Sequence, residues 1–165
     1  MKRLLILSGK GGTGKTTTAA AFIQFSQSRA IADCDVDAPN LHIVTEKTGE
    51  CRTKEFIGSK KAVIDETLCV HCGNCAEKCR FNAISDKGMS YGVDEYHCEG
   101  CGVCQYVCPN DAVRLVEDVA GKQELYLGDT VFSTATLKMS RGNSGKLVTA
   151  VKLDMLKHAP ETELA

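Results

Sequence analysis

Eight of the ten cysteines in this 165-residue chain fall into two runs with the same spacing. Cys98, which opens the second run, follows Cys69 by 29 residues, and the other three pairs of cysteines keep that offset. The two runs are Cys69, Cys72, Cys75 and Cys79, and Cys98, Cys101, Cys104 and Cys108. The flanking residues 64–66 and 93–95 also repeat. A repeat this short buries little apolar surface, so its fold has to depend on what the cysteines bind.

The spacing Cys-x2-Cys-x2-Cys-x3-Cys is typical of iron–sulfur ligands, and its duplication resembles bacterial-type ferredoxins with two [4Fe–4S] clusters. In that family the fourth cysteine of each run binds the cluster of the other run. The resemblance implies that Cys69, Cys72, Cys75 and Cys108 hold cluster one and that Cys98, Cys101, Cys104 and Cys79 hold cluster two. Arg80 stands where the second run has Pro109, which we expect to tune a potential without removing a ligand.

Two other uses of these cysteines are weighed against the clusters. A secreted disulfide framework is disfavoured because eight cysteines keep metal-cluster spacing, and a zinc ribbon is disfavoured by the doubled pattern.

The four apolar residues 4–7 are too few for the core of a signal peptide, and no stretch approaches the ~18 residues of a membrane span. A net charge of −1 gives no reason to expect nucleic-acid binding. We therefore expect a cytoplasmic protein.

A second motif stands near the start of the chain. Residues 9–16, Gly-Lys-Gly-Gly-Thr-Gly-Lys-Thr, match the phosphate-binding loop pattern Gly-x4-Gly-Lys-Thr. We expect a buried parallel strand over 2–7 before it and a helix over about 16–28 after it, with a stripe of apolar residues facing the core. Backbone N–H groups of the loop would then cradle phosphates, while Lys15 reaches the β- and γ-phosphates and Thr16 binds Mg²⁺.

Lys10 extends the resemblance. The run Lys-Gly-Gly-Thr-Gly-Lys-Thr-Thr over 10–17 resembles the deviant Walker A loop of MinD/ParA-type ATPases, relatives of the nitrogenase iron protein. The resemblance implies MgATP as ligand, a nucleotide-dependent homodimer and a Lys10 that contacts nucleotide across the dimer interface. It also implies that Asp35 orients the attacking water and that Asp33 helps to hold Mg²⁺. The implied nucleotide-binding residues are Gly9, Lys10, Gly11, Gly12, Thr13, Gly14, Lys15, Thr16 and Thr17, with Lys10, Lys15 and Asp35 catalytic.

The resulting fold class is α/β, with a partial parallel sheet of P-loop NTPase type and an inserted α+β ferredoxin-like domain. The nucleotide-binding domain takes 1–61 and 118–165, and the ferredoxin domain takes 62–117. We expect a strand over 30–32, another over 124–132 and a helix over about 145–157 capped by Ser144, which gives the host sheet three strands. Residues 140–147 imitate a second phosphate loop but lack its first glycine and its final Ser/Thr.

The leading functional prediction is an ATP-binding iron–sulfur protein that couples its nucleotide state to electron transfer toward a redox partner protein. Complete relatives of the implied ATPase family continue with a switch strand that residues after Lys157 do not supply, so we expect a truncated product or a fragment, which weakens the expectation of hydrolysis. Two alternatives stay open: a plain ferredoxin-type carrier with a vestigial nucleotide domain, and a scaffold for cluster assembly.

Overall fold

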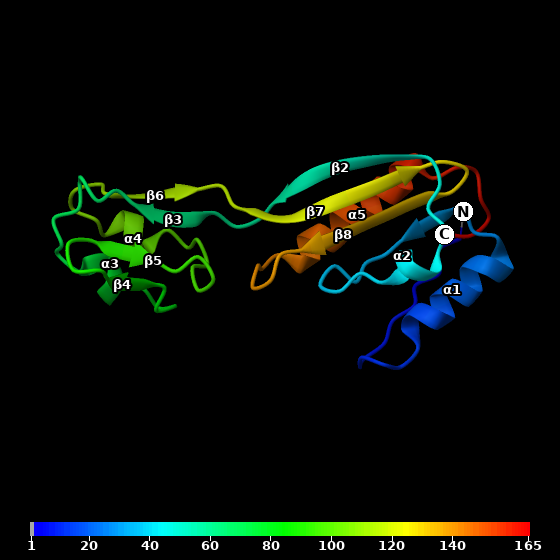
Figure 1. The fold of residues 1–165 in the computed structure, drawn as a ribbon, viewed down its shortest axis with the longest axis horizontal. Helices are drawn as coiled ribbons and strands as arrows, with labels where there is room; N and C mark the ends of the chain where they lie inside the picture. Colours follow the sequence, from blue (N-terminus) through cyan, green and yellow to red (C-terminus); the bar gives the residue numbers. More distant parts are fainter. Residues whose placement is uncertain (1) are drawn as a thin grey trace. The chain divides into compact units, whose positions relative to one another are not determined.

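A computed structural model describes residues 2–165. Backbone contacts divide the chain into two compact units, whose elements are labelled in Figure 1. The first unit runs to Phe56 and resumes over Gly121–Met139 and Asn143–Ala165. The second unit, which we call the cysteine unit, comprises Ile57–Ala120 with the short segment Ser140–Gly142.

The first unit is built on a four-stranded sheet with the order β1, β8, β7, β2. These strands are β1 Ala30–Ala32, β8 Val131–Leu137, β7 Val119–Leu127 and β2 Glu50–Ile57. Strand β1 runs parallel to β8, while β7 and β8 form an antiparallel hairpin. Helix α5, Ser144–His158, lies along β8 (Figure 1) and buries Leu147, Val151 and Met155. This contact removes the side chains of Leu147 and Val151 almost completely from solvent.

The other face of the unit carries helix α1, Lys15–Ser26, and the short helix α2, Leu41–Val44. Helix α1 begins one residue before its predicted start. The prediction that its apolar stripe is buried is wrong. Ala19 and Ile23 pack against the Ile31–Phe132 cluster, whereas the side chain of Phe25 is 89% exposed. The helix therefore has little apolar surface removed from water on this side of the sheet.

The predicted first strand over residues 2–7 is also wrong. Only Lys2 pairs, in an isolated bridge with Leu164, and the leucines at 4, 5 and 7 are exposed. The backbone bonds of this segment go to the chain end, since Lys2 N–H donates to Glu163 and Leu4 N–H donates to Ala165. An apolar run becomes a buried strand only where strands and helices are present to cover it.

The purely parallel sheet is a further wrong prediction. Residues 124–132 are not one strand, because the turn at Gly128 and Asp129 divides them between β7 and β8. Glycine and aspartate favour such a turn. The resulting hairpin makes the sheet mixed and gives it four strands instead of three. The cap of α5 is Asn143, and Ser144 is the first helical residue.

The cysteine unit contains two small two-stranded sheets, and its halves have the same order of elements. The first half holds β3 Lys61–Ile64, α3 Asn74–Glu77 and β4 Ile84–Asp86. The second half holds β5 Tyr91–Val93, α4 Val103–Tyr106 and β6 Val113–Val116. Strand β3 pairs with β6 and β4 pairs with β5, both antiparallel. Each sheet thus joins one strand from each half, so the sequence repeat becomes two interlocked halves.

Candidate functional site

The cysteine unit has two small cavities whose walls carry the eight cysteines in two sets of four. Cys69, Cys72, Cys75 and Cys108 line the first cavity. Cys98, Cys101, Cys104 and Cys79 line the second. Each set takes three cysteines from one run and the fourth from the other. Within residues 2–165, no three His, Cys, Asp or Glu side chains meet at the spacing of a single-ion site. The donor sets suit two clusters, since four thiolates around an apolar cavity are what a [4Fe–4S] cluster requires.

Left-handed backbone positions recur at the same places in the two halves. Gly73 and Gly102, which precede helices α3 and α4, both have φ of 81°. Asn82 and Asp111 also match, at 52° and 51°, and each lies three residues after the fourth cysteine of its run. These turns reverse the chain around each cavity, and Gly, Asn and Asp are the residues that adopt them at least cost. The local sequence therefore sets the path on which the cysteines sit.

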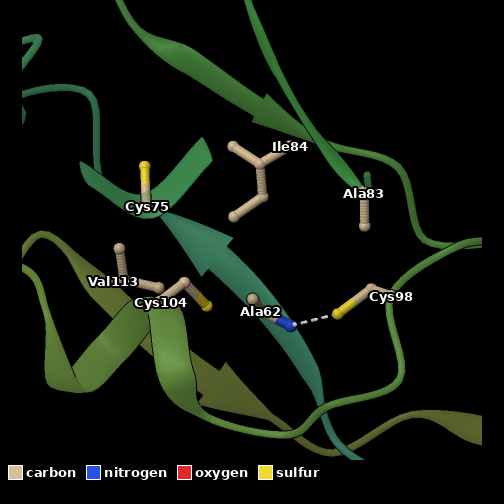
Figure 2. Packing of buried hydrophobic residues seen from close by; sticks show 7 residues of the cluster. All are labelled: Ala62, Cys75, Ala83, Ile84, Cys98, Cys104 and Val113. Atoms are coloured by element: carbon tan, nitrogen blue, oxygen red, sulfur yellow. Dashed lines mark hydrogen bonds between the residues drawn. The ribbon is translucent and has the colours of Figure 1, made fainter. Parts of the chain in front are cut away.

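Backbone N–H groups donate to the cysteine sulfurs. Ala83 N–H donates to Cys79 Sγ at 3.4 Å, and its counterpart Ala112 donates to Cys108 Sγ at 3.3 Å. Ala62 N–H donates to Cys98 Sγ at 3.4 Å, the contact drawn as a dashed line in Figure 2. Such bonds favour the thiolate over the thiol and help to set the potential of a bound cluster.

Two aspartates fix the turns that lead into the cysteine runs. Asp65 accepts hydrogen bonds from the N–H and hydroxyl of Thr67, which lower the pKa of its carboxyl group. Asp94, 29 residues later, accepts bonds from His97 and from Tyr96 N–H, which lower its pKa in the same way. The two carboxylates hold equivalent loops in equivalent shapes just before Cys69 and Cys98.

The third cysteine of each run is buried, as is Cys98, the first of the second run. Cys75 on α3 and Cys104 on α4 lie within the unit's core, and burial raises the pKa of both thiols. An apolar pocket disfavours a bare thiolate, so deprotonation at these positions depends on a cationic partner such as iron. Cys72 and Cys101 are exposed and mark the outer edge of each cavity.

Sequence reasoning missed two cations in this unit. Lys61 is buried and donates its ammonium to the backbone carbonyl of Cys98. Arg141, from the connection between β8 and α5, contacts the Glu95 and Asp118 carboxylates at 2.6 and 2.8 Å and lies over the Tyr96 ring. A comparison of the two halves could have found Lys61, because the matching position 29 residues later holds Ser90, which carries no charge. No sequence signal connects Arg141 with residues 95 and 118.

The phosphate-loop residues form an exposed turn in the first unit. Gly12 and Gly14 have φ of 77° and 83°, and a Cβ added at Gly9, Gly11, Gly12 or Gly14 would meet nothing within 4 Å. Thr13 donates its hydroxyl to the Lys10 carbonyl, while Thr17 is an exposed residue of α1. The loop is thus open to solvent and leads directly into a helix N-terminus.

The remaining predicted nucleotide and magnesium residues pair with each other. Lys15 Nζ lies 2.5 Å from Asp35 Oδ2, and Thr16 donates to Asn40 Oδ1 at 2.6 Å. Asp33 is buried and accepts bonds from the N–H groups of Asp35 and Leu41. Lys15, Thr16, Asp33 and Asp35 all line a cavity of about 460 Å³ beside α1, whose other walls are mostly apolar.

The two cysteines outside the runs lie in the first unit. Cys34 follows Asp33, and burial raises the pKa of its thiol. Cys51 is exposed on β2. Neither cysteine lines the two cavities of the cysteine unit, which makes both useful as controls.

Comparison with known proteins supports an iron–sulfur domain in the cysteine unit. Residues 62–115 match the family described as a 4Fe-4S dicluster domain. An uncharacterized protein of Methanocaldococcus jannaschii is 31% identical over 96% of this chain and 56% of its own length. An uncharacterized ferredoxin of the same organism is 30% identical over 71% of this chain and 75% of its own length. The pyruvate synthase subunit PorD, again from that organism, is 32% identical over 46% of this chain and 81% of its own length.

The chain spans about half the length of the first of these relatives. The matched family and the ferredoxin relatives concern the iron–sulfur domain, so nucleotide binding rests on the residues of the first unit alone. Among the described residues, no helix is both long and apolar enough to cross a bilayer. The cysteine pattern, the two cavities and the similarity over three quarters of a ferredoxin lead to one conclusion: the chain belongs to the ferredoxins and carries a 4Fe-4S dicluster domain.

Proposed function

We propose that this protein is a ferredoxin-type electron carrier that takes up and passes on single electrons through two [4Fe–4S] clusters. The observation that carries this proposal is the crossed lining of the two cavities by four cysteines each. When bound, such a cluster supplies a reversible one-electron couple at low potential. Cys69, Cys72, Cys75 and Cys108 would be the ligands of cluster one, and Cys98, Cys101, Cys104 and Cys79 those of cluster two.

The rest of the unit would adjust that chemistry. The N–H groups of Ala62, Ala83 and Ala112 stabilise negative charge on sulfur. The apolar core, which includes Ile84 and Val113, keeps water away from the inner sulfurs. The exposed Cys72 and Cys101 mark the edges at which a partner protein would approach. PorD is named as a subunit of pyruvate synthase, and by analogy we propose a larger redox enzyme as the partner.

The test is iron content and spectroscopy of the anaerobically reconstituted protein. We expect about eight iron atoms per chain and, after reduction by dithionite, EPR signals of reduced [4Fe–4S] clusters. Cys108→Ala should lose or convert cluster one and so lower the iron content, because it removes one of its four thiolates. Cys34→Ser and Cys51→Ser are matched controls that leave iron content unchanged. Four or fewer iron atoms in the wild-type chain would overturn the two-cluster proposal.

A second candidate function is binding of MgATP by the first unit, which we propose as the nucleotide-binding domain over 1–61 and 118–165. The supporting observation is the open glycine loop before α1, with Lys15 and Thr16 on the first turn and Asp33 and Asp35 nearby. The Lys15–Asp35 ion pair is half-exposed and lies at the helix N-terminus. A β-phosphate would compete with Asp35 for the Lys15 ammonium. The Asp35 carboxylate would then be free to interact with Mg²⁺ and water.

Calorimetry with MgATP tests this second proposal. Lys15→Ala should weaken binding at least tenfold, because the charge that offsets the phosphates is removed. Lys10→Ala should leave the affinity of the monomer nearly unchanged but prevent nucleotide-dependent dimers, which sedimentation velocity would detect. If MgATP does not bind at millimolar concentration, electron transfer remains the only proposed function. For that function we propose a reducing compartment such as the cytoplasm. Hydrolysis, in which Asp35 would orient the attacking water, is tested separately by measuring phosphate release.

A further inference from the structure

The two halves of the cysteine unit match in their ligands but differ in the charges beside them. Lys61, at the start of β3, corresponds by the 29-residue offset to Ser90, just before β5. Both side chains are buried. Lys61 directs an ammonium to the carbonyl of Cys98, a lining residue of the second cavity. Ser90 instead donates a neutral hydroxyl to Glu66 at 3.2 Å.

Lys61 is an unusual residue for such a position. Its side chain is 9% exposed, and no carboxylate of residues 2–165 lies within ion-pair distance of it. A buried ammonium without a carboxylate is costly, so a compensating negative charge is expected close to it. The thiolates of the second cavity can supply that charge, because the Lys61 ammonium contacts the Cys98 carbonyl and Ala62, the next residue, donates its N–H to Cys98 Sγ (Figure 2).

The backbone holds Lys61 against that cavity. A Cβ added at Gly100 would lie 2.0 Å from the Lys60 carbonyl oxygen, so this strand and the second run of cysteines touch directly. Gly100 has a φ of 67°, which suits glycine. Arg80 adds an exposed cation on the same side, since it follows Cys79, another lining residue of the second cavity. Its counterpart beside the first cavity is the neutral Pro109.

We propose that Lys61 is the counter-charge of cluster two and makes it the higher-potential cluster of this carrier. The proposal rests on the proposed electron-carrier function. Reduction adds one electron to a cluster and so increases its negative charge by one, which a nearby fixed ammonium stabilises. The positions that match Lys61 and Arg80 in the repeat hold the neutral Ser90 and Pro109. Glu99, which lines the second cavity and is matched by Val70 in the first, offsets one of the two added cations, so the second cavity keeps an excess of one positive charge at these positions. An electron entering at cluster one would therefore pass to cluster two.

The experiment is an EPR-monitored redox titration with dithionite as the electron donor. The wild-type protein should show two separate one-electron steps. Lys61→Met keeps the length of the stem and removes the charge, so it should lower the higher-potential step. The expected change is roughly tenfold in the ratio of reduced to oxidised cluster, which is about 59 mV for one electron. The lower step should move by less than a third as much.

Lys60→Met is the matched control, because it removes the same charge from an exposed neighbour and should leave both steps in place. Arg80→Pro, which copies the other run, should lower the same higher step by a smaller amount. If Lys61→Met fails to bind iron, Lys61→Gln, which keeps a hydrogen-bond donor for the Cys98 carbonyl without the charge, is titrated instead, and an unmoved higher step in that variant overturns the proposal.

Coincident wild-type steps, an unchanged Lys61→Met titration, or movement of the lower step alone would each overturn it as well. These outcomes differ from failure of the carrier function itself, which would appear as absent clusters in the wild-type protein.

Discussion

The two compact units of this chain are stabilised in different ways. In the first unit apolar side chains are buried on both faces of the sheet, Leu147 and Val151 of α5 on one and Phe132 of β8 with Ile31 and Leu41 on the other. In the cysteine unit three of the seven core residues are themselves cysteines that line the cavities, Cys75, Cys98 and Cys104. We therefore expect the first unit to gain its stability from packing and the second from ligation. This difference predicts that the two can be perturbed separately.

Iron removal should have the largest effect. Chelation under reducing conditions takes away the groups around which the cysteine unit folds, so residues 57–120 should unfold completely. Hydrogen exchange followed by mass spectrometry should show loss of amide protection in β3, β4, β5 and β6. The amides of β8 and α5 should keep their protection. Equal loss of protection in α5 would mean that the chain is one cooperative unit.

Truncation of a core aromatic should have the next largest effect, in the opposite unit. Phe132→Ala removes a fully buried ring opposite Ile31 and should lower the free energy of unfolding of the first unit by about 3–5 kcal/mol. Denaturant unfolding measures the change. Phe25→Ala, at an exposed site of α1, is the control and should stay within about 0.5 kcal/mol of wild type. Iron content should be unaltered in both variants.

Arg141→Met should have an intermediate effect on the cysteine unit. The guanidinium is 7% exposed, so its loss leaves the Asp118 and Glu95 carboxylates without their partner. We expect a loss of about 2–3 kcal/mol, below the full value for a completely buried pair because Glu95 is exposed. Thermal unfolding followed at the cluster absorption band measures it. Arg52→Met, whose ion pair with Glu50 is exposed, should change stability by well under 1 kcal/mol.

The smallest effect concerns acid stability. Hydrogen bonds from Thr67 lower the pKa of Asp65, and bonds from His97 and Tyr96 lower the pKa of Asp94. Each carboxylate therefore stabilises the folded state above the unfolded aspartate pKa, near 3.9, and loses that contribution as pH falls through its lower folded value. Asp65→Asn and Asp94→Asn should flatten the pH dependence of unfolding below about pH 4.5. A wild-type slope in either variant would contradict this assignment.

The contrast between the units also explains what could be read from the sequence. Ligand spacing is a strict geometric requirement, so the cysteine positions were enough to predict an internal repeat, and the two halves have the same order of elements. The left-handed turn at Gly73 and Gly102 follows from the same repeat. The role of Lys61 could not be predicted, because the burial of its side chain and its bond to the Cys98 carbonyl depend on tertiary structure.

The first unit was harder to predict because its elements depend on neighbours distant in sequence. The apolar run over 4–7 was expected to be a buried strand, but it does not pair with the edge strand β1, and of residues 2–7 only Lys2 forms a bridge, with Leu164. The hairpin at Gly128 is hard to predict because residues on both sides of the turn favour strands. The phosphate loop could be located by its pattern, whereas the Lys15–Asp35 pair depends on tertiary structure.

Arg141 has a consequence for the order in which this protein is made. Every cysteine of the two runs leaves the ribosome before residue 141, so a nascent chain that takes up iron early does so with Asp118 still unneutralised. The same holds for any attempt to excise the iron–sulfur part as a miniature carrier. A gene fragment cut at residues 57 and 120 would omit the arginine that closes the fold. A minimal carrier from this chain needs a short graft bearing residues 140–142.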